Sequence, residues 1–287
     1  MNRDYLIGIV FKLLNCLLFP VMSLLMLKCV ATVPVMQVFF AQVFLGAIIS
    51  LIYLFIIRQS ISLKLPKKEI MLYLARAITN FMAIQLWIYS LTSLGINEAT
   101  ALGYTGPLWV CLMAKYIIGE RFRIGILLLI AVNMIGMLII LQPKYVDMHW
   151  HGVGAALAAI LLWSVYEVIC KKQTANQHYM LQTFYFMSIS SLVMAPFALS
   201  YWQDINLQEI TMLIMLALFA VANITVIFIA YSFAPLTLLS PFSYARLIFT
   251  VFLTAWLHQI SPNIHIFIGA AIIMIANGYF SYRIKKI

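Results

Sequence analysis

The chain has 287 residues, of which 65% are apolar and only 9% are charged, and its formal net charge at pH 7 is +10. Because soluble globular domains contain about 45–50% apolar and about 25% charged residues, these values exclude a water-soluble fold and indicate an all-α integral membrane protein. In a soluble domain the positive charge would suggest nucleic acid. Here Lys and Arg lie mostly in short loops between apolar runs, so we expect no nucleic-acid partner.

A transmembrane helix needs about 20 apolar residues, roughly 17–25 in practice. Ten such runs follow one another, and very short turns at "SLGIN" and "FAPLT" separate two pairs of them. The four cysteines lie in or beside apolar runs with no CxxC pair, so we expect buried thiols rather than disulfides. The predicted spans are 5–27, 35–56, 70–92, 97–118, 124–142, 152–170, 179–200, 209–231, 235–257 and 264–282.

The placement of Lys and Arg predicts an orientation. With the N-terminus in the cytosol, twelve basic residues fall in inside loops and only Lys28 and Lys144 fall in outside loops, which satisfies the positive-inside rule. An even number of spans then puts both termini in the cytoplasm, and we place the protein in the cell inner membrane. The inside residues are Arg3, Arg58, Lys64, Lys67, Lys68, Arg121, Arg123, Lys171, Lys172, Arg283, Lys285 and Lys286.

The stretch "GYTGPLWVCLMAKYIIGER" interrupts the apolar pattern of the fourth span. Pro107 inside a helix removes a hydrogen bond and predicts a kink. At the end of the stretch, Gly119 is expected to end the helix and Arg121 to anchor it at the inner face. Pro241 in the ninth span predicts a second break, so two helices are expected to bend around a central cavity.

Ten spans can also be two copies of five. A shift of 139 residues places the quoted stretch on "FSYARLIFTVFLTAWLHQI", with Glu120 on Gln259, so the second copy lacks the acid. A shift of 144 residues pairs the first span with the sixth. Because five is odd, the two predicted repeats, 1–145 and 146–287, would be inverted relative to each other, an arrangement that recurs in secondary transporters.

Two long motifs, one in each half, carry a resemblance to a known family. "YSLTSLGINEATALGYTGPLWVCLMAKYIIGER" resembles the third-to-fourth-span signature of the drug/metabolite transporter superfamily, ten-helix EamA type, and "AYSFAPLTLLSPFSYARLIFTVFLTAWL" is similar to its counterpart in the second half. The resemblance implies an inverted-repeat transporter of small metabolites. Arg76 stands where the family often has an arginine, whereas Gln259 replaces the usual second glutamate. The arginine that opens the third span and the Pro-Phe-x-Tyr run also resemble those of members that import S-adenosylmethionine.

Ionisable residues inside the spans are functional candidates, and their depth separates them. Arg246 lies about eleven residues into the ninth span, roughly 16 Å into a core of about 30 Å. There it is a candidate for binding a substrate carboxylate or phosphate, or else a partner for backbone carbonyls or Glu167. Arg76, Lys12 and Lys115 lie near enough to the cytosolic edge for their side chains to reach it, which favours anchoring. Anchoring is also favoured for Glu167, but Glu167 and Arg76 are kept as site candidates.

Aromatic side chains are the second group of candidates, although in spans they more often pack or form interfacial belts. Tyr104 and Tyr244 rank first because they flank the two helix breaks. Such rings can also hold a cationic ligand by cation–π attraction. The other aromatic candidates are Trp163, Tyr166, Trp87 and Trp109. Asn15, a further substrate-binding candidate, and Asn80, Gln85 and Asn223 are expected either to line the cavity or to bond helix to helix.

Sequence signatures of enzymes are missing, since no H-E-x-x-H, Walker loop or Gly-x-Ser-x-Gly occurs. We therefore expect no catalytic residue and no cofactor. The two histidines of "MHWHG" are too few for a strong metal site, so no metal is expected either.

The deep basic residues outnumber the one deep acid, which favours an anionic or zwitterionic substrate. We therefore predict a secondary transporter of a small metabolite, amino-acid-like or S-adenosylmethionine-like, that works by alternating access in the lipid bilayer as a monomer or homodimer. One alternative is an exporter of drugs or lipophilic metabolites on the same fold. The other is a non-transporting membrane scaffold.

Overall fold

The computed structural model describes residues 3–61, 65–121, 124–143, 149–174, 177–259 and 263–284. Within these ranges the chain is helical without any strand, and ten segments are long and apolar enough to cross a membrane. The all-α class and the ten spans are therefore confirmed. The four cysteines are buried and free, as predicted. Part of the predicted orientation rests on residues outside the described ones, namely Lys64, Arg123, Lys144, Lys285, Lys286 and the side chain of Arg283.

Eight spans are single helices and two are interrupted. The single helices are α1 (Arg3–Val30), α2 (Val35–Ile56), α3 (Lys67–Leu94), α6 (Ile124–Leu141), α7 (Trp150–Thr174), α8 (Tyr179–Leu199), α9 (Leu207–Phe233) and α12 (Ile264–Ile284). The fourth span consists of α4 (Ile96–Gly103) and α5 (Gly106–Ile118). The ninth consists of α10 (Leu236–Leu239), the 3₁₀ helix η1 (Ser240–Tyr244) and α11 (Ala245–His258). Each end lies within four residues of the predicted one.

Both predicted helix breaks are present, and each has a local cause. The helix α5 starts two residues after Tyr104 and has Pro107 in its first turn, where the missing N–H of proline removes no helical hydrogen bond. In the ninth span Pro241 lies in the first turn of η1, whose tighter 3₁₀ winding joins α10 to α11. The fourth span is interrupted by the two turn residues Tyr104 and Thr105, whereas the ninth stays helical throughout and changes to 3₁₀ winding between α10 and α11.

The two interrupted spans end in the same way. Gly119 follows α5 with a left-handed φ of 70°, which confirms it as the helix-ending glycine, and Gln259 follows α11 with a φ of 52°. Tyr104 and Tyr244, at the two breaks, are 140 residues apart, as are the two caps. This spacing is one residue longer than the predicted shift of 139, which pairs Gln259 with Glu120.

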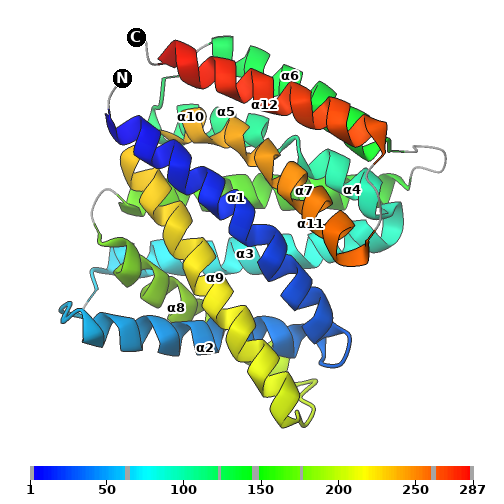
Figure 1. Cartoon of the computed structure of the whole chain (residues 1–287). Helices are drawn as coiled ribbons and strands as arrows, with labels where there is room; N and C mark the ends of the chain where they lie inside the picture. Colours follow the sequence, from blue (N-terminus) through cyan, green and yellow to red (C-terminus); the bar gives the residue numbers. More distant parts are fainter. Residues whose placement is uncertain are drawn as a thin grey trace.

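The helices pair between the two halves of the chain. The most extensive contacts join α1 to α9, α3 to α7, α2 to α8 and α6 to α12. Figure 1 shows α6 and α12 together at the top and α1 with α9 in front. Glycines allow the α6–α12 approach, because a Cβ atom on Gly136 would lie 2.9 Å from the carbonyl oxygen of Gly269. The interior is therefore lined by helices of both halves.

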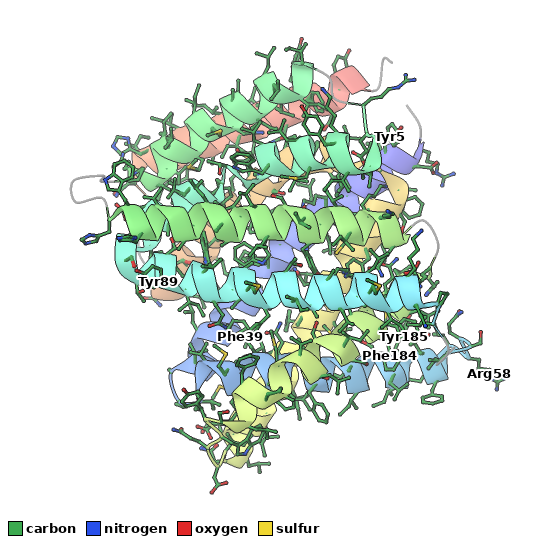
Figure 2. All side chains as sticks on the ribbon, turned by 180° about the vertical axis from the view of Figure 1, so that it is seen from behind. Tyr5, Phe39, Arg58, Tyr89, Phe184 and Tyr185 are labelled. Atoms are coloured by element: carbon green, nitrogen blue, oxygen red, sulfur yellow. The ribbon has the colours of Figure 1, made fainter. Side chains whose placement is uncertain are left out.

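Labelled side chains in Figure 2 mark the two ends of the helical bundle. Tyr5 at the start of α1 and Arg58 just after α2 lie at the right-hand end of the view. Tyr89, near the end of α3, lies at the left-hand end. The helices α1, α2 and α3 thus run in alternating directions, as the predicted order of their inside and outside loops requires.

Candidate functional site

Arg246, the deepest predicted cation, lies on the first turn of α11. Its guanidinium carbon is 3.9 Å from the centroid of the Phe19 ring on α1, a cation–π contact that joins the two halves. The guanidinium donates no hydrogen bond to a described residue, and its Nε is buried without a partner. The alternative predicted role, binding backbone carbonyls or Glu167, is therefore not seen within the described part of the chain. The donors of Arg246 are free to bind a ligand.

Tyr104 and Tyr244 form a stacked pair beside Arg246. Their ring centroids are 5.5 Å apart with an angle of 24° between the planes. The Tyr244 hydroxyl donates to the backbone carbonyl oxygen of Tyr104 at 2.7 Å. Tyr244 is fully buried, whereas Tyr104 is half-buried and lies near the Arg246 charge. The pair therefore fixes the chain at the first helix break and leaves Tyr104 as the more accessible ring.

Lys12 is a second enclosed cation, and it lies over the Tyr231 ring. Lys12 lies two helical turns before Phe19 on the same side of α1, and only 1% of its surface is exposed. Its Nζ is 6.0 Å from the centroid of the Tyr231 ring. Glu167 and Arg246 are both near enough for their charges to act on Lys12. The predicted anchoring of Lys12 at the membrane edge is wrong, because its side chain is enclosed by other helices.

Arg76 is also enclosed, with no exposed surface, so the predicted anchoring is wrong for it too. Its Nη1 donates to Gln173 Oε1 at 2.6 Å, and Gln173 Nε2 donates to Glu69 Oε2 at 3.2 Å. Its Nε and Nη2 have no partner among the described residues. Four ring centroids lie 4.6 to 5.5 Å from the guanidinium carbon, those of Tyr73, Tyr166, Phe186 and Phe228. Lys115, by contrast, is exposed, as anchoring requires.

Trp163 and Asn15, the remaining candidates, take part in contacts between helices. Trp163 Nε1 donates to Asn80 Oδ1 at 3.2 Å, which joins α7 to α3. Asn15 and Asn223 each donate a side-chain N–H to the backbone carbonyl of the other, at 3.2 and 3.1 Å, which joins α1 to α9. Trp163 is half-buried and Asn15 is buried, so Trp163 is the more accessible of the two.

The structure thus divides the predicted site residues into groups. Arg246, Tyr104 and Tyr244 lie together, Glu167 is connected to them through Lys12, and Tyr166 belongs to the aromatic enclosure of Arg76. Sequence reasoning missed Phe19 and did not count Lys12 as a site residue. Their spacing of seven residues on α1, which places both on one side of a helix, is the signal that could have found them.

Glu120 has a role that sequence reasoning also missed. Its two carboxylate oxygens accept hydrogen bonds from the backbone N–H groups of Leu236 and Thr237, each at 2.9 Å. The carboxylate therefore caps the start of α10, which has no side-chain cap from its own N-cap residue. Lys171 Nζ donates to carbonyl oxygens at the end of α9, including that of Ala234 at 2.9 Å. We call Glu120, Lys171 and this turn the α9–α10 clasp.

Ten membrane-length helices around an interior that contains buried cations define a multi-pass membrane protein of the kind that moves small molecules. The chain belongs to the EamA-like transporter family, whose sequence model matches residues 6–142 and again residues 150–280. The predicted family is therefore confirmed, and the chain is a transporter of a small molecule and not an enzyme. The alternative of a non-transporting scaffold is set aside.

Similar proteins with described activities include transporters of different substrates. The S-adenosylmethionine uptake transporter of Rickettsia prowazekii is 24% identical over 214 residues, 75% of this chain and 72% of the relative. The pseudopaline exporter CntI of Pseudomonas aeruginosa is 25% identical over 69% of this chain and 67% of its own. The riboflavin transporter of Brucella anthropi is 28% identical over 72% of this chain and 75% of its own. A protein crystal structure with 17% identity has a TM-score of 0.79 over 94% of this chain and 96% of its own, and therefore has the same fold.

Proposed function

We propose that the protein is a secondary carrier of a small anionic or zwitterionic metabolite and works by alternating access. Residues 1–145 and 146–287 act in this proposal as two inverted repeats of five helices. Two findings support it: the family model matches each half separately, and helices of one half pack mainly on helices of the other. The distribution of Lys and Arg supports an inner-membrane location with both termini in the cytoplasm.

We choose an anionic group for the substrate because of one observation, the environment of the Arg246 guanidinium. It is a half-buried cation deep in its span, it connects the two halves through Phe19, and its guanidinium has no hydrogen-bond partner among the described residues. A guanidinium in such a place matches a planar anion such as a carboxylate, which it can hold with two parallel hydrogen bonds. In the proposal, Arg246 binds the anionic end of the substrate.

The other candidates have distinct roles in this proposal. Tyr104 and Trp163, whose rings are half-buried, contact the body of the substrate. Glu167, whose charge acts on Lys12, contacts the substrate in this proposal, and Tyr166 takes part through the enclosure of Arg76. Three buried residues, Tyr244, Asn15 and Arg76, act by holding helices in place, Tyr244 through Tyr104, Asn15 through Asn223 and Arg76 through Gln173.

The similar proteins are named for different directions of transport, so the direction for this chain is a matter for experiment. One similar protein is named for S-adenosylmethionine uptake and another for pseudopaline export, so one fold serves both directions. We propose uptake of an amino-acid-like or S-adenosylmethionine-like substrate. Export of drugs or lipophilic metabolites is the second candidate, which the pseudopaline relative keeps open.

The test uses purified protein and proteoliposomes. Thermal unfolding is measured against a panel of amino acids, nucleotides, carboxylates and S-adenosylmethionine, and uptake of the best ligand is then followed with radiolabel. Arg246→Ala is expected to abolish both the stabilisation and the uptake, while Arg246→Lys keeps part of the binding because it keeps the charge but loses the two-pronged geometry. The control is Lys115→Ala, which removes an exposed cation. Normal uptake by Arg246→Ala would refute the assignment.

A further inference from the structure

We propose that Arg76, Gln173 and Glu69 form a gate that closes the path between the two halves at one end of the bundle. The gate is shut in this structure, where hydrogen bonds join its three residues, and it opens when α3 and α7 separate and water reaches the enclosed guanidinium. The inference rests on the proposed alternating access. It goes further by naming the contact that has to break.

Three residues along one side of α3 hold the end of α7. Glu69, Tyr73 and Arg76 follow one another at spacings of four and three residues, so they lie in line on the helix. Gln173, near the end of α7, joins the first to the last. Its Oε1 accepts from Arg76 Nη1 at 2.6 Å, and its Nε2 donates to Glu69 Oε2 at 3.2 Å. The Tyr73 hydroxyl donates to Gln177 Oε1, just beyond α7. Side-chain hydrogen bonds thus fasten a helix of the second half to a helix of the first.

The contact lies toward the end of the bundle that carries both termini. The rings of Tyr73 and Tyr185 pack with their centroids 5.7 Å apart. Figure 2 shows Tyr185 toward the same end as Tyr5 and Arg58, and Figure 1 shows the two termini close together. In the proposed orientation this is the cytoplasmic end.

The closed gate leaves part of the Arg76 guanidinium without hydrogen-bond partners. No surface of Arg76 is exposed, and its Nε and Nη2 have no partner among the described residues. A neutral amide and aromatic rings stand where a guanidinium binds water or a carboxylate more strongly. Hydration of the free donors favours the open gate, whereas the hydrogen bonds of Gln173 favour the closed one. The gate is therefore a contact that water can break.

The opposite end of the bundle has a corresponding contact between α1 and α9. The shift of 144 residues for the first and sixth spans places Gly8 on Gly152, and the spacing of 140 found at the two breaks places Leu94 on Ala234. A Cβ atom added to Gly152 would lie 2.9 Å from Leu94 Cγ, and one added to Gly8 would lie 2.7 Å from Ala234 Cβ. The packing of α7 on α3 therefore matches the packing of α1 on α9.

In this match the gate residues meet apolar counterparts. The same two shifts place Arg76 on Leu216 and Gln173 on Cys29. Leu216 and Cys29 are buried in one hydrophobic cluster. Separation of that cluster exposes apolar surface to water, which is unfavourable, whereas separation of the gate hydrates a cation. The two ends thus differ in what holds them closed, and the end with Arg76 is the one that opens more readily.

Native cysteines can report the opening of each end. Cys170 lies one turn before Gln173 on the same side of α7, and Cys29 lies in the apolar cluster. Their exposed fractions are 0% and 1%. Two parent proteins each keep one of these thiols and have the other three cysteines replaced by alanine. Both are placed in lipid nanodiscs, where each face of the bilayer meets the buffer, and the rate of labelling by a charged methanethiosulfonate is measured.

Two gate variants should change the labelling of Cys170 in opposite directions. Gln173→Ala removes the acceptor of Arg76 and the donor to Glu69, so Cys170 should be labelled at least about tenfold faster than in the parent. The double variant Arg76→Leu/Gln173→Leu makes this end apolar like the other. It should melt at the parent temperature or above, and its Cys170 should be labelled at least about tenfold more slowly.

Gln37→Ala is the matched control for Cys170. Gln37 is also a fully buried glutamine that bonds across the halves, through the backbone of Gln203 at 2.8 and 3.1 Å. Because it contacts no gate residue in these hydrogen bonds, Cys170 labelling should stay within about twofold of the parent rate.

The Cys29 parent separates failure of the gate from failure of alternating access. Since the two ends of such a carrier do not open together, Gln173→Ala should slow the labelling of Cys29 while it speeds that of Cys170. Unchanged Cys170 labelling in both gate variants would overturn the gate and leave the Arg246 proposal standing. Faster labelling of both thiols in Gln173→Ala would also overturn it, because the contact would then be a structural support. The expected Cys170 rates with an unchanged Cys29 rate would instead refute alternating access.

Discussion

The α9–α10 clasp allows a quantitative prediction about Glu120. Its carboxylate accepts two hydrogen bonds at 2.9 Å from backbone N–H groups of a helix that lies 116 residues away in sequence. Hydrogen bonds to a charged group contribute about 1.5–3 kcal/mol each. Because Glu120 is half-buried, the lower end of that range applies, and Glu120→Ala is expected to lower the free energy of unfolding by about 3 kcal/mol.

Two further variants make the prediction specific. Glu120→Gln keeps one oxygen that can accept from a single N–H, so it should lose about half as much stability, about 1–2 kcal/mol. Asp204→Asn is the control, since it removes an exposed acid near the start of α9 and should change stability by less than about 0.5 kcal/mol. The loss of stability is therefore expected to be largest in Glu120→Ala, smaller in Glu120→Gln and smallest in the Asp204→Asn control.

Thermal unfolding of the purified protein in detergent, followed by tryptophan fluorescence, measures these differences. For a large domain, 1 kcal/mol corresponds to about 2–4 °C in melting temperature, so Glu120→Ala should melt about 6–12 °C below wild type and Glu120→Gln about 2–8 °C below it. A Glu120→Ala protein that melts together with the Asp204→Asn control would refute the reasoning. The two hydrogen bonds would then contribute nothing to holding the halves together.

Two other predictions concern stability. Gly136→Ala should destabilise the protein by about 1–3 kcal/mol, because the new Cβ would lie 2.8 Å from Ile273 Cγ1 and 2.9 Å from a backbone oxygen. Gly154→Ala, with nothing within 4 Å of its new Cβ, should instead stabilise α7 by about 0.5–1 kcal/mol. Equal melting temperatures of the two variants would contradict this prediction. Burial lowers the pKa of the His178 imidazole, so the unfolded chain binds more protons, and stability should fall as the pH drops from about 7 through the ordinary value of about 6.5. When the pH is lowered over this range, the melting temperature of His178→Asn should fall less than that of the wild type. An equal fall in both proteins would contradict the prediction.

The spans and their breaks could be predicted because their causes are local. A membrane-length apolar run sets the existence of a helix, and a proline or glycine sets where it stops. Gly119 shows this well, since its left-handed φ of 70° ends α5 at the predicted position. The register between the fourth and ninth spans is constrained by few identical residues. The two left-handed caps, Gly119 and Gln259, are 140 residues apart, one more than the predicted shift.

The burial of Lys12 and Arg76 could not be predicted from depth along a helix. Depth says how far a side chain must reach to leave the membrane, but not which side of the helix faces the protein. For Arg76 the deciding neighbours come from α3, α7, α8 and α9, and no local pattern announces such an enclosure. Glu120 is a similar case, since its partners are backbone N–H groups, which no sequence motif marks.

At the helix breaks, the backbone groups that leave the helical pattern need other hydrogen-bond partners. A break frees backbone groups that must find partners, because no water or lipid group supplies them. At the first break the Tyr244 hydroxyl satisfies the carbonyl of Tyr104. Along α10 and η1, Cys111 and Cys16 approach the carbonyls of Thr237 and Phe242, and the Asn133 amide approaches that of Pro241. Side chains from α1, α5 and α6 thus hold the interrupted ninth span, and the two breaks act as fixed supports for Arg246 and Tyr104 rather than as loose hinges.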